Sequence, residues 1–492
     1  MLDRNRQDLD PVGCRPVHRI HVRNGKEHSA QDRDMGVQGM DSFILADTRL
    51  FWPTFEECFM AFFRSTARLT GLEPKTLLIR VMDCMSYDTD YWAEMASVDA
   101  LEGSVIDRRA LSLRCPVDLS YHPSDRWPAW LLDLMPQGVA RARIAREEGL
   151  RPDDLAVELQ LLRRAGGAPI GNLRIREAWE AEQERIAGLE CPPLTDEDIF
   201  NRSERFLDVV DRFAHLASGS SGVQGEWPKA LMTRSARDGF WYLDPFVRTE
   251  DGIEHVIIKL LKSSGDNDRL ILEAEAPYLE LARSFGLNCA AALRYEPGVL
   301  IMPRFDREVA DDKVLLHGQE SLTSALGVAE FGVSRTHEDY LEIIDLYSDD
   351  PAGDRLEYLM RDVLNMAAGN PDNHGRNTAM QRPAQGGIRL APLFDFAPMR
   401  LSDAGIARQS RWRCLEGRDL GTDWAAVCDA VACEGLSVDE VRLALVGMLP
   451  ALRDLPGTAA ELGVPDKVIE HAIRPDQMIA AIEALEGVQC QP

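Results

Sequence analysis

The chain has 492 residues, of which 45% are hydrophobic, so we expect two or three packed units with sizeable cores. Its net charge of −26 and its pI near 4.8 argue against autonomous binding of nucleic acid, which needs a basic surface. No apolar run is long enough for a transmembrane helix, and the ten cysteines are scattered without a Cys-x-x-Cys pair, which favours a cytoplasmic protein.

The first two units in chain order carry no recognisable catalytic cluster. Residues 1–41 are polar and lack the apolar segment of a secretory signal, so we interpret them as a disordered extension; translation from Met40 is an alternative. Residues 42–186 are predicted to form a small α+β unit with a structural or partner-binding role. Its expected elements are strands at 76–82 and 109–115 and helices within 127–150 and at 153–165.

The third unit, residues 187–303, begins with a charged, proline-bearing linker over 187–208, followed by a glycine-rich stretch. From Ser218 to Gly225, three glycines and three serines allow backbone amides to approach an anion closely. The stretch is not a Walker A loop, and a flexible turn is the competing interpretation. The residues that follow, 230–242, predict a hairpin around an Asp-Gly turn.

A lysine inside an apolar strand is the next signal. Residues 255–261 read as a nearly continuous apolar strand that contains Lys259, which costs stability unless it is paired or reaches solvent. The helix predicted at 269–285 carries Glu273 and Glu275 near its start, and either could pair with Lys259 or compensate the helix dipole. Pro277 belongs in a first helical turn, which would place Glu275 at the helix cap.

The last unit, residues 304–492, is expected to be mainly helical. It follows a strand hairpin at 293–302, and its Arg-Phe-Asp-Arg opening at Arg304 is typical of a surface ion-pair cluster. A polar helical region is expected over 324–357. Further helices with N-cap residues near their starts are expected at 423–432, 437–449, 466–473 and 476–485.

One loop in this unit concentrates polar side chains. An amphipathic helix runs into Gly369 and Pro371, which end it, and Asp372, His374 and Asn377 follow within six positions. A short strand is predicted at 388–394, with Asp395 at its end. Such oxygen-bearing residues suit Mg²⁺, which takes one or two side-chain ligands and fills the rest with phosphate and water. A simple turn is the competing interpretation.

The order of these features matches what phosphoryl transfer from ATP requires. It needs a covering loop, a cation on the phosphates, metal ligands and a carboxylate that accepts the hydroxyl proton. In this interpretation Lys259 holds phosphate oxygens, Asn377 and Asp395 hold Mg²⁺, and Asp372 is the base.

Several of these motifs together resemble the HipA-like kinases, the toxins of bacterial type II toxin–antitoxin pairs. The resemblance spans roughly residues 77–485, and Arg-Phe-Asp-Arg together with Asp-x-His-x-x-Asn is its most specific part. The matching stretches are Gly222-Val223-Gln224 with Pro228-Lys229, Ile257 to Lys259, Leu281 to Leu287, Arg304 to Arg307, Gly369 to Asn377 and Leu393 to Met399.

The resemblance implies an α+β, two-lobed, protein-kinase-related fold with a small mixed N-terminal lobe and a mainly helical C-terminal lobe, and with ATP and Mg²⁺ between them. Gly222, Val223 and Gln224 would cover the nucleotide. Met302, Arg304 and Phe305 would meet the adenine, Glu275 would pair with Lys259, and His374 would shape the catalytic loop.

The resemblance also implies a function in a toxin–antitoxin module. It suggests transfer to serine or threonine of a host protein, which in characterised family members can be an aminoacyl-tRNA synthetase. It implies a small DNA-binding HipB-like antitoxin as partner, with DNA contacted only indirectly. An acidic chain suits such a basic partner.

The sequence also departs from the family pattern. The stretch from Gly222 to Pro228 resembles a divergent branch, and Ser218, Ser220 and Ser221 are the candidate sites for autophosphorylation of this loop. Two other functions stay open at this level. One is a kinase-fold regulatory or binding protein with little catalysis, and the other is a nuclease or nucleotidyl-transfer enzyme on the same scaffold.

Overall fold

The structure is a computed structural model that describes residues 44–46, 60–65, 75–81, 110–115, 127–151, 156–214, 227–310, 313–416 and 423–486. Residues 1–41, the predicted extension, and the glycine-rich stretch before Trp227 lie outside the described residues. Among the described helices, none combines the length and apolar character that crossing a membrane requires.

The N-terminal part of the described chain is an antiparallel sheet with helices, as the sequence predicts. The strand expected at 76–82 is β3. In the four-stranded order β1-β2-β3-β4 it pairs with β2, which precedes it in the sequence, and with β4, which follows it. Trp130, Leu131 and Leu162 are in the apolar core of this part. The elements are β1 (Ile44–Ala46), β2 (Met60–Ser65), β3 (Lys75–Val81), η3 (Ala129–Leu134), α2 (Gly138–Glu147), α3 (Ala156–Ala165), β4 (Leu173–Ile175) and α4 (Arg176–Ile186).

The prediction of a strand at 109–115 is wrong. Residues 110–115 form a tight turn closed by the bond from the Cys115 amide to the Ser112 carbonyl. The Leu113 amide and the Ser112 hydroxyl donate to the Glu320 carboxylate at 2.8 and 2.7 Å. A distant side chain therefore satisfies the polar groups that a neighbouring strand would otherwise bind.

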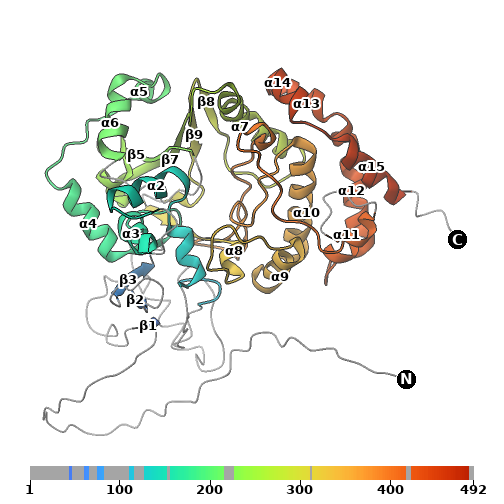
Figure 1. The fold of residues 1–492 in the computed structure, drawn as a ribbon, viewed down its shortest axis with the longest axis horizontal. Helices are drawn as coiled ribbons and strands as arrows, with labels where there is room; N and C mark the ends of the chain where they lie inside the picture. Colours follow the sequence, from blue (N-terminus) through green and yellow to red (C-terminus); the bar gives the residue numbers. More distant parts are fainter. Residues whose placement is uncertain are drawn as a thin grey trace, which may run out of the picture. The chain divides into compact units, whose positions relative to one another are not determined.

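A five-stranded antiparallel sheet follows, in the order β6-β5-β7-β9-β8. Val256 and Ile258 of β7 pack with Phe206 of α6 in one apolar cluster, so this face of the sheet is covered by α6. Leu300 packs with Ile271 of α7 in another cluster, and Figure 1 shows α7 running beside the sheet. The elements are α5 (Asp196–Phe200), α6 (Glu204–Ala214), β5 (Lys229–Ser235), β6 (Trp241–Leu243), η4 (Asp244–Phe246), η5 (Thr249–Asp251), β7 (Gly252–Leu260), α7 (Asp266–Ser284), β8 (Arg294–Glu296) and β9 (Val299–Pro303).

Two expectations for this region need correction. Residues 187–208 are not only a linker, because Leu194 is buried and exchanges two backbone hydrogen bonds with Trp241, and α5 begins at a capping box on Thr195. Pro277 lies inside α7, eleven residues after its start, and not in its first turn. Glu275 therefore sits within the helix and not at its cap. The apolar face of α7 outweighs the one amide bond that Pro277 removes.

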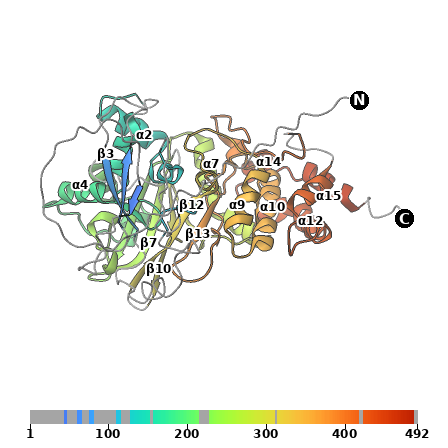
Figure 2. The same cartoon turned by 90° about the horizontal axis from the view of Figure 1, so that it is seen from below.

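The remaining residues form a small sheet and a helical region around the largest apolar cluster. Figure 2 shows α9 and α10 lying between the strands β12 and β13 and the C-terminal helices α12 and α15. The elements are β10 (Arg307–Ala310), β11 (Lys313–Leu316), β12 (Gly318–Ser321), α8 (Leu322–Ala325), α9 (His337–Tyr347), α10 (Pro351–Ala368), β13 (Ala379–Arg382), β14 (Arg389–Leu390), η6 (Met399–Leu401), α11 (Trp424–Val431), α12 (Val438–Arg453), α13 (Leu455–Glu461), α14 (Asp466–His471) and α15 (Asp476–Glu486).

The predicted helix into Gly369 is confirmed as α10, with Leu359, Val363 and Leu364 buried. The strand predicted at 388–394 is regular only over β14, although Leu393 continues in an isolated parallel bridge with Cys289. The predicted helical region 324–357 is three helices separated by loops. The expected C-terminal helices do not include α13, whose Pro456 occupies the first turn, where proline is tolerated.

Candidate active site

A cavity of about 130 Å³ lies where these parts meet. Six of the predicted site residues border it: Glu275, Met302, Arg304, Phe305, Asn377 and Asp395. The N-terminal part also contributes to its wall. These additional lining residues are Asp133, Leu134 and Ile170.

Lys259, on the middle strand of the five-stranded sheet, lies beside this cavity, because its partners Glu275 and Asp395 line it. Because side chains alternate along a strand, Ile258 faces α6 while Lys259 faces α7. The Lys259 ammonium donates to Glu275 Oε2 of α7 at 2.5 Å and to Asp395 Oδ1 at 3.1 Å. A lysine, a helix glutamate and an aspartate 136 residues away are thus gathered in one buried ion pair network.

The charges in this network shift one another's ionisation. Burial alone would lower the pKa of Lys259, but the carboxylates of Asp395 and Glu275 outweigh it and raise the pKa above its usual value. Burial alone would raise the pKa of Asp395, but Lys259 and the nearby Lys229 hold it well below the usual range. Asp395 is therefore an anion that is available to bind a cation.

Asp395 is held in an unusual backbone conformation, with φ of 52°. Left-handed backbone costs a non-glycine residue roughly 1–2 kcal/mol, so neighbouring contacts must stabilise it. Phe394 packs on Phe305 with ring centroids 5.6 Å apart, and Phe396 packs on Tyr278 at 5.4 Å. These two anchors turn the Asp395 carboxylate toward Lys259.

The predicted catalytic loop is a compact, self-bonded turn after α10. The Asn377 side-chain Nδ2 donates to the Asp372 carbonyl at 3.0 Å, and the Asp372 backbone N–H donates to Asn370 Oδ1 at 3.3 Å. His374 Nε2 lies 3.3 Å from Asp372 Oδ1, while its buried Nδ1 has no hydrogen-bond partner among the described residues. The loop thereby places a carboxylate, an imidazole and an amide near Asp395.

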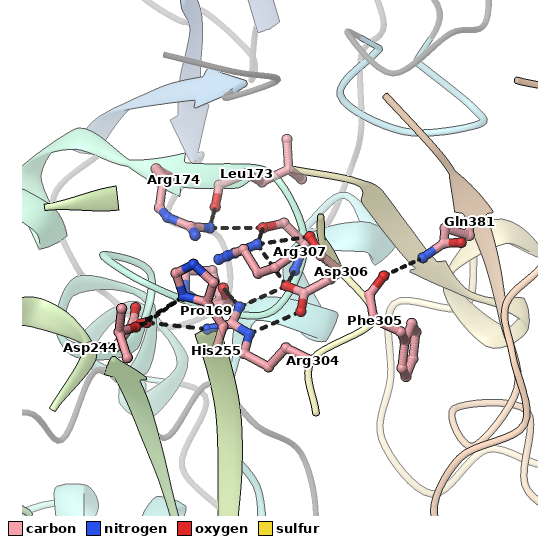
Figure 3. A network of polar contacts seen from close by, with 12 residues as sticks. Pro169, Leu173, Arg174, Asp244, His255, Arg304, Phe305, Asp306, Arg307 and Gln381 are labelled. Atoms are coloured by element: carbon pink, nitrogen blue, oxygen red, sulfur yellow. Dashed lines mark hydrogen bonds and ion pairs between the residues drawn. The ribbon is translucent and has the colours of Figure 1, made fainter. Parts of the chain in front are cut away.

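Arg304 lines the cavity with Met302 and Phe305, and it also belongs to a buried ion-pair cluster. Its guanidinium is fully buried and donates to both oxygens of Asp306 at 2.9 and 2.6 Å (Figure 3). Arg307 donates to the same carboxylate at 2.8 Å, and Asp244 lies 3.6 Å from Arg304. Burial would raise the pKa of Asp306, but the two arginines lower it well below the usual range.

This cluster is therefore not the surface ion-pair group that the sequence suggests. The Gly171 amide donates to Asp306 at 2.8 Å, so the cluster joins the N-terminal part to the strand end that borders the cavity. A contact of Arg304 with nucleotide stays a prediction.

Sequence reasoning missed Lys229 as a site residue. It lines the cavity and lies directly opposite Lys259 in the pairing of β5 with β7. Burial lowers the pKa of Lys229, and the neighbouring Lys259 lowers it further, against the attraction of Asp395. The alternation of Ala230 and Met232 toward α6 would have placed Lys229 on the cavity face, had the register of the two strands been known.

Two parts of the predicted site cannot be compared with the structure. Gly222, Val223 and Gln224 lie outside the described residues, as do Ser218, Ser220 and Ser221. For metal binding, no group of three or more His, Cys, Asp or Glu side chains of suitable geometry occurs among the described residues. The predicted pair, Asn377 and Asp395, lines the cavity but is not such a group.

Comparison with known proteins shows similarity to HipA-like proteins. Residues 221–449 match the model of the HipA-like C-terminal domain. The chain is 28% identical over 287 residues to "Putative kinase Y4mE" of Sinorhizobium fredii, a match that covers 54% of this chain and 62% of that protein. The chain thus spans less than two thirds of the length of this curated relative.

A solved structure shares the fold at low sequence identity. It is the Shewanella oneidensis MR-1 toxin–antitoxin system HipA, in complex with HipB and its operator DNA, with a TM-score of 0.57 and 16% identity. The match covers 89% of this chain and 99% of that one. The fold is thus a HipA-like mixture of helices and sheets. Together, these matches show a HipA-like C-terminal domain over residues 221–449 and a HipA-like fold.

Proposed function

We propose that this chain is an ATP- and Mg²⁺-dependent protein serine/threonine kinase, with residues 187–303 and 304–492 as its two lobes. The observation that carries the proposal is the Lys259 ammonium, held between Glu275 and Asp395 beside a cavity that Asn377 also lines. A cation fixed between a helix glutamate and a metal-binding aspartate is what phosphoryl transfer from ATP requires.

The residues around the cavity fit magnesium–ATP. Lys259 and Lys229 provide two cations for phosphate oxygens, and Asp395 and Asn377 provide the oxygen ligands that Mg²⁺ prefers. The buried Nδ1 of His374 lacks a partner among the described residues and is a further polar group that a ligand could satisfy. Met302 and Phe305 provide an apolar wall suited to the adenine ring.

Bound magnesium–ATP would supply the phosphoryl group and neutralise charge that develops during its transfer. Lys259 and Lys229 hold the phosphates in place, and Glu275 keeps Lys259 oriented toward them. Asp372 accepts the proton from the hydroxyl of the substrate serine or threonine. His374 and Asn377 fix the loop, since Asn377 bonds to the Asp372 backbone and His374 contacts its carboxylate.

We further propose that the kinase acts in the cytoplasm as the toxin of a HipBA-like module. The similarity to HipA-like proteins supports a host protein as substrate, for which an aminoacyl-tRNA synthetase is the candidate, and a HipB-like antitoxin as partner. The net charge of −26 favours a basic partner and leaves DNA contact mainly to it.

Transfer of phosphate from labelled ATP tests the kinase activity. Wild type, Asp372→Asn and Asp439→Asn are compared in the presence of Mg²⁺, both in buffer and in host lysate. Asp439 is a matched control because its side chain is 88% exposed on α12, away from the cavity. We expect wild type and Asp439→Asn to label the chain itself or one lysate protein, and Asp372→Asn to be slower by about 10²-fold or more.

The alternatives give different results. If no variant labels any protein while ATP still binds, the kinase proposal fails and a regulatory role is favoured. If Asp372→Asn transfers phosphate as fast as wild type, Asp372 is not the base.

A further inference from the structure

Asp133 of η3, in the N-terminal part of the chain, lines the cavity and contacts the catalytic loop. Its carboxylate is largely buried, with 13% of the side chain exposed. Oδ1 accepts from Arg376 Nη1 at 2.6 Å and from Ser321 Oγ at 2.8 Å, and Oδ2 accepts from the Ser321 amide at 2.8 Å. One side chain therefore joins two segments that lie 188 and 243 residues further along the chain.

The first segment is the start of α8. Ser321 is the N-cap of this short helix, and its hydroxyl accepts from the Ser324 amide. The next two amides of α8 donate to the catalytic loop, from Leu322 to the Thr378 carbonyl at 2.9 Å and from Thr323 to the Gly375 carbonyl at 3.3 Å. Asp133 thus binds Ser321, which begins α8, and the next two amides of α8 bind the backbone of the loop.

The second segment is the loop itself. Arg376 immediately precedes Asn377, the predicted metal ligand. Its guanidinium is fixed by Asp133, by Ser324 Oγ at 3.2 Å and by the ring of Phe331, whose centroid is 5.0 Å from the guanidinium carbon. Residues 375–378 are therefore held from the backbone through α8 and from the side chain through Arg376, and both supports depend on Asp133.

We propose that Asp133 is a positioning residue for phosphoryl transfer, which acts through Arg376 and Ser321 to hold Asn377 and the catalytic loop in their active geometry. The inference rests on the proposed kinase function. It assigns a catalytic role to the N-terminal part of the chain, which sequence reasoning treats as structural or partner-binding.

A neighbouring carboxylate provides a matched control. Glu320 precedes Ser321 on β12 and is also buried, and it also binds the N-terminal part, through Ser112 and Leu113. Its third partner is Arg382 at 3.1 Å, and it makes no contact with residues 375–378 among the interactions of the described residues. We therefore expect Glu320→Gln to weaken the attachment of the N-terminal part while the direct bonds of Asp133 to Arg376 and Ser321 stay in place.

The experiment compares wild type, Asp133→Asn, Arg376→Gln, the double variant and Glu320→Gln in the full chain. Measurements are kcat and the KM for ATP with the acceptor labelled by wild type, the melting temperature, and hydrogen exchange of peptides covering 370–380. We expect Asp133→Asn to lower kcat by roughly 10- to 100-fold, since displacing a reacting group by about 1 Å costs that much. The KM for ATP should stay within about twofold, and exchange in 370–380 should rise.

The two remaining variants separate positioning from folding. Adding Asp133→Asn to Arg376→Gln should lower kcat by less than Asp133→Asn does alone, because the two residues share one interaction. Glu320→Gln should lower the melting temperature but leave kcat and the exchange of 370–380 unchanged. The proposal is overturned if Asp133→Asn keeps wild-type kcat, or if Glu320→Gln lowers kcat as much. If wild type transfers no phosphate at all, the proposed kinase function fails. If hydrogen exchange of residues 370–380 is unchanged in Asp133→Asn, Asp133 does not hold the loop, whatever the result for kinase activity.

Discussion

Gly369 connects α10 to the catalytic loop and shows how far a single residue determines the position of the site. Its φ is 77°, which glycine adopts without strain and other residues adopt at a cost. A Cβ at this position would also meet the Ala472 carbonyl oxygen at 2.3 Å. Two backbone hydrogen bonds hold this part of the chain: the Arg474 amide donates to the Ala367 carbonyl, and the Arg400 amide donates to the Gly369 carbonyl. The chain after α14 therefore packs directly against the start of the loop.

Replacing Gly369 by alanine should weaken both folding and transfer. We expect the free energy of unfolding to fall by about 3 kcal/mol, from the backbone conformation and the steric contact together. The control is Gly332→Ala, because Gly332 has φ of 75° but nothing within 4 Å of the added Cβ. That variant should lose only about 1 kcal/mol. Urea unfolding and the rate of phosphate transfer measure the difference, and equal losses in the two variants would contradict the steric argument.

At the scale of elements, the segment 403–414 illustrates how an irregular stretch is fixed beside the site. Asp362 of α10 is buried and accepts from Arg408 at 2.7 Å and from the Trp412 indole at 3.0 Å. The Asn373 side chain, next to Asp372, accepts from the Gln409 amide and donates to the Ser410 carbonyl. Side chains from a helix and from the catalytic loop thus replace the strand neighbours that this extended segment lacks.

Asp362→Asn should release this segment from α10. Removing one partner of a buried ion pair costs about 3 kcal/mol or more, because Asp362 no longer offers a charged acceptor to Arg408 and Trp412. We expect trypsin to cleave faster after Arg408, Arg411 or Arg413 under native conditions. Asp403→Asn is the control within the same segment, since Asp403 is exposed and accepts a hydrogen bond from the Asn267 side chain, outside this segment. Cleavage patterns that match in the two variants would show that Asp362 does not hold the segment.

How far the elements could be predicted depends on whether local pattern decides them. Periodicity was enough for β7, β9 and α10, whose apolar faces pack on neighbouring elements. It failed at 110–115, where the distant Glu320 satisfies the backbone, and at Pro277, where tertiary packing overrides a helix-breaking residue. The pairing of Lys259 with Glu275 was expected because a resemblance pointed to it, and not from spacing alone.

Long-range geometry accounts for the site residues that were missed. Lys229 reaches the cavity through the register of β5 on β7, and no local pattern specifies that register. Asp133 reaches Arg376 across 243 residues, inside a unit that has no catalytic cluster in its own sequence. Such partners become visible only when the chain is folded.

At the scale of the whole molecule, the cavity is bordered by every major part of the described chain. Asp133 comes from the N-terminal part, Lys229 and Met302 from the five-stranded sheet, and Asn377 and Asp395 from the helical part. A ligand that fills this cavity would contact residues from all three parts and would favour their assembled state. Nucleotide binding should therefore stabilise the chain as one unit.

Metal removal tests this linkage. With Mg²⁺ and a non-hydrolysable ATP analogue at 100 times its dissociation constant, we expect the free energy of unfolding to rise by about 2.7 kcal/mol. Chelation of Mg²⁺ should remove most of this gain in wild type. In Asp395→Asn the gain should be small with or without Mg²⁺, because the carboxylate ligand is lost while Lys259 stays paired with Glu275. The melting temperature reports each condition, and Asp439→Asn should behave as wild type. A full Mg²⁺-dependent rise in Asp395→Asn would mean that the metal is held elsewhere, and that the Lys259–Asp395 pair has a role other than binding magnesium–ATP.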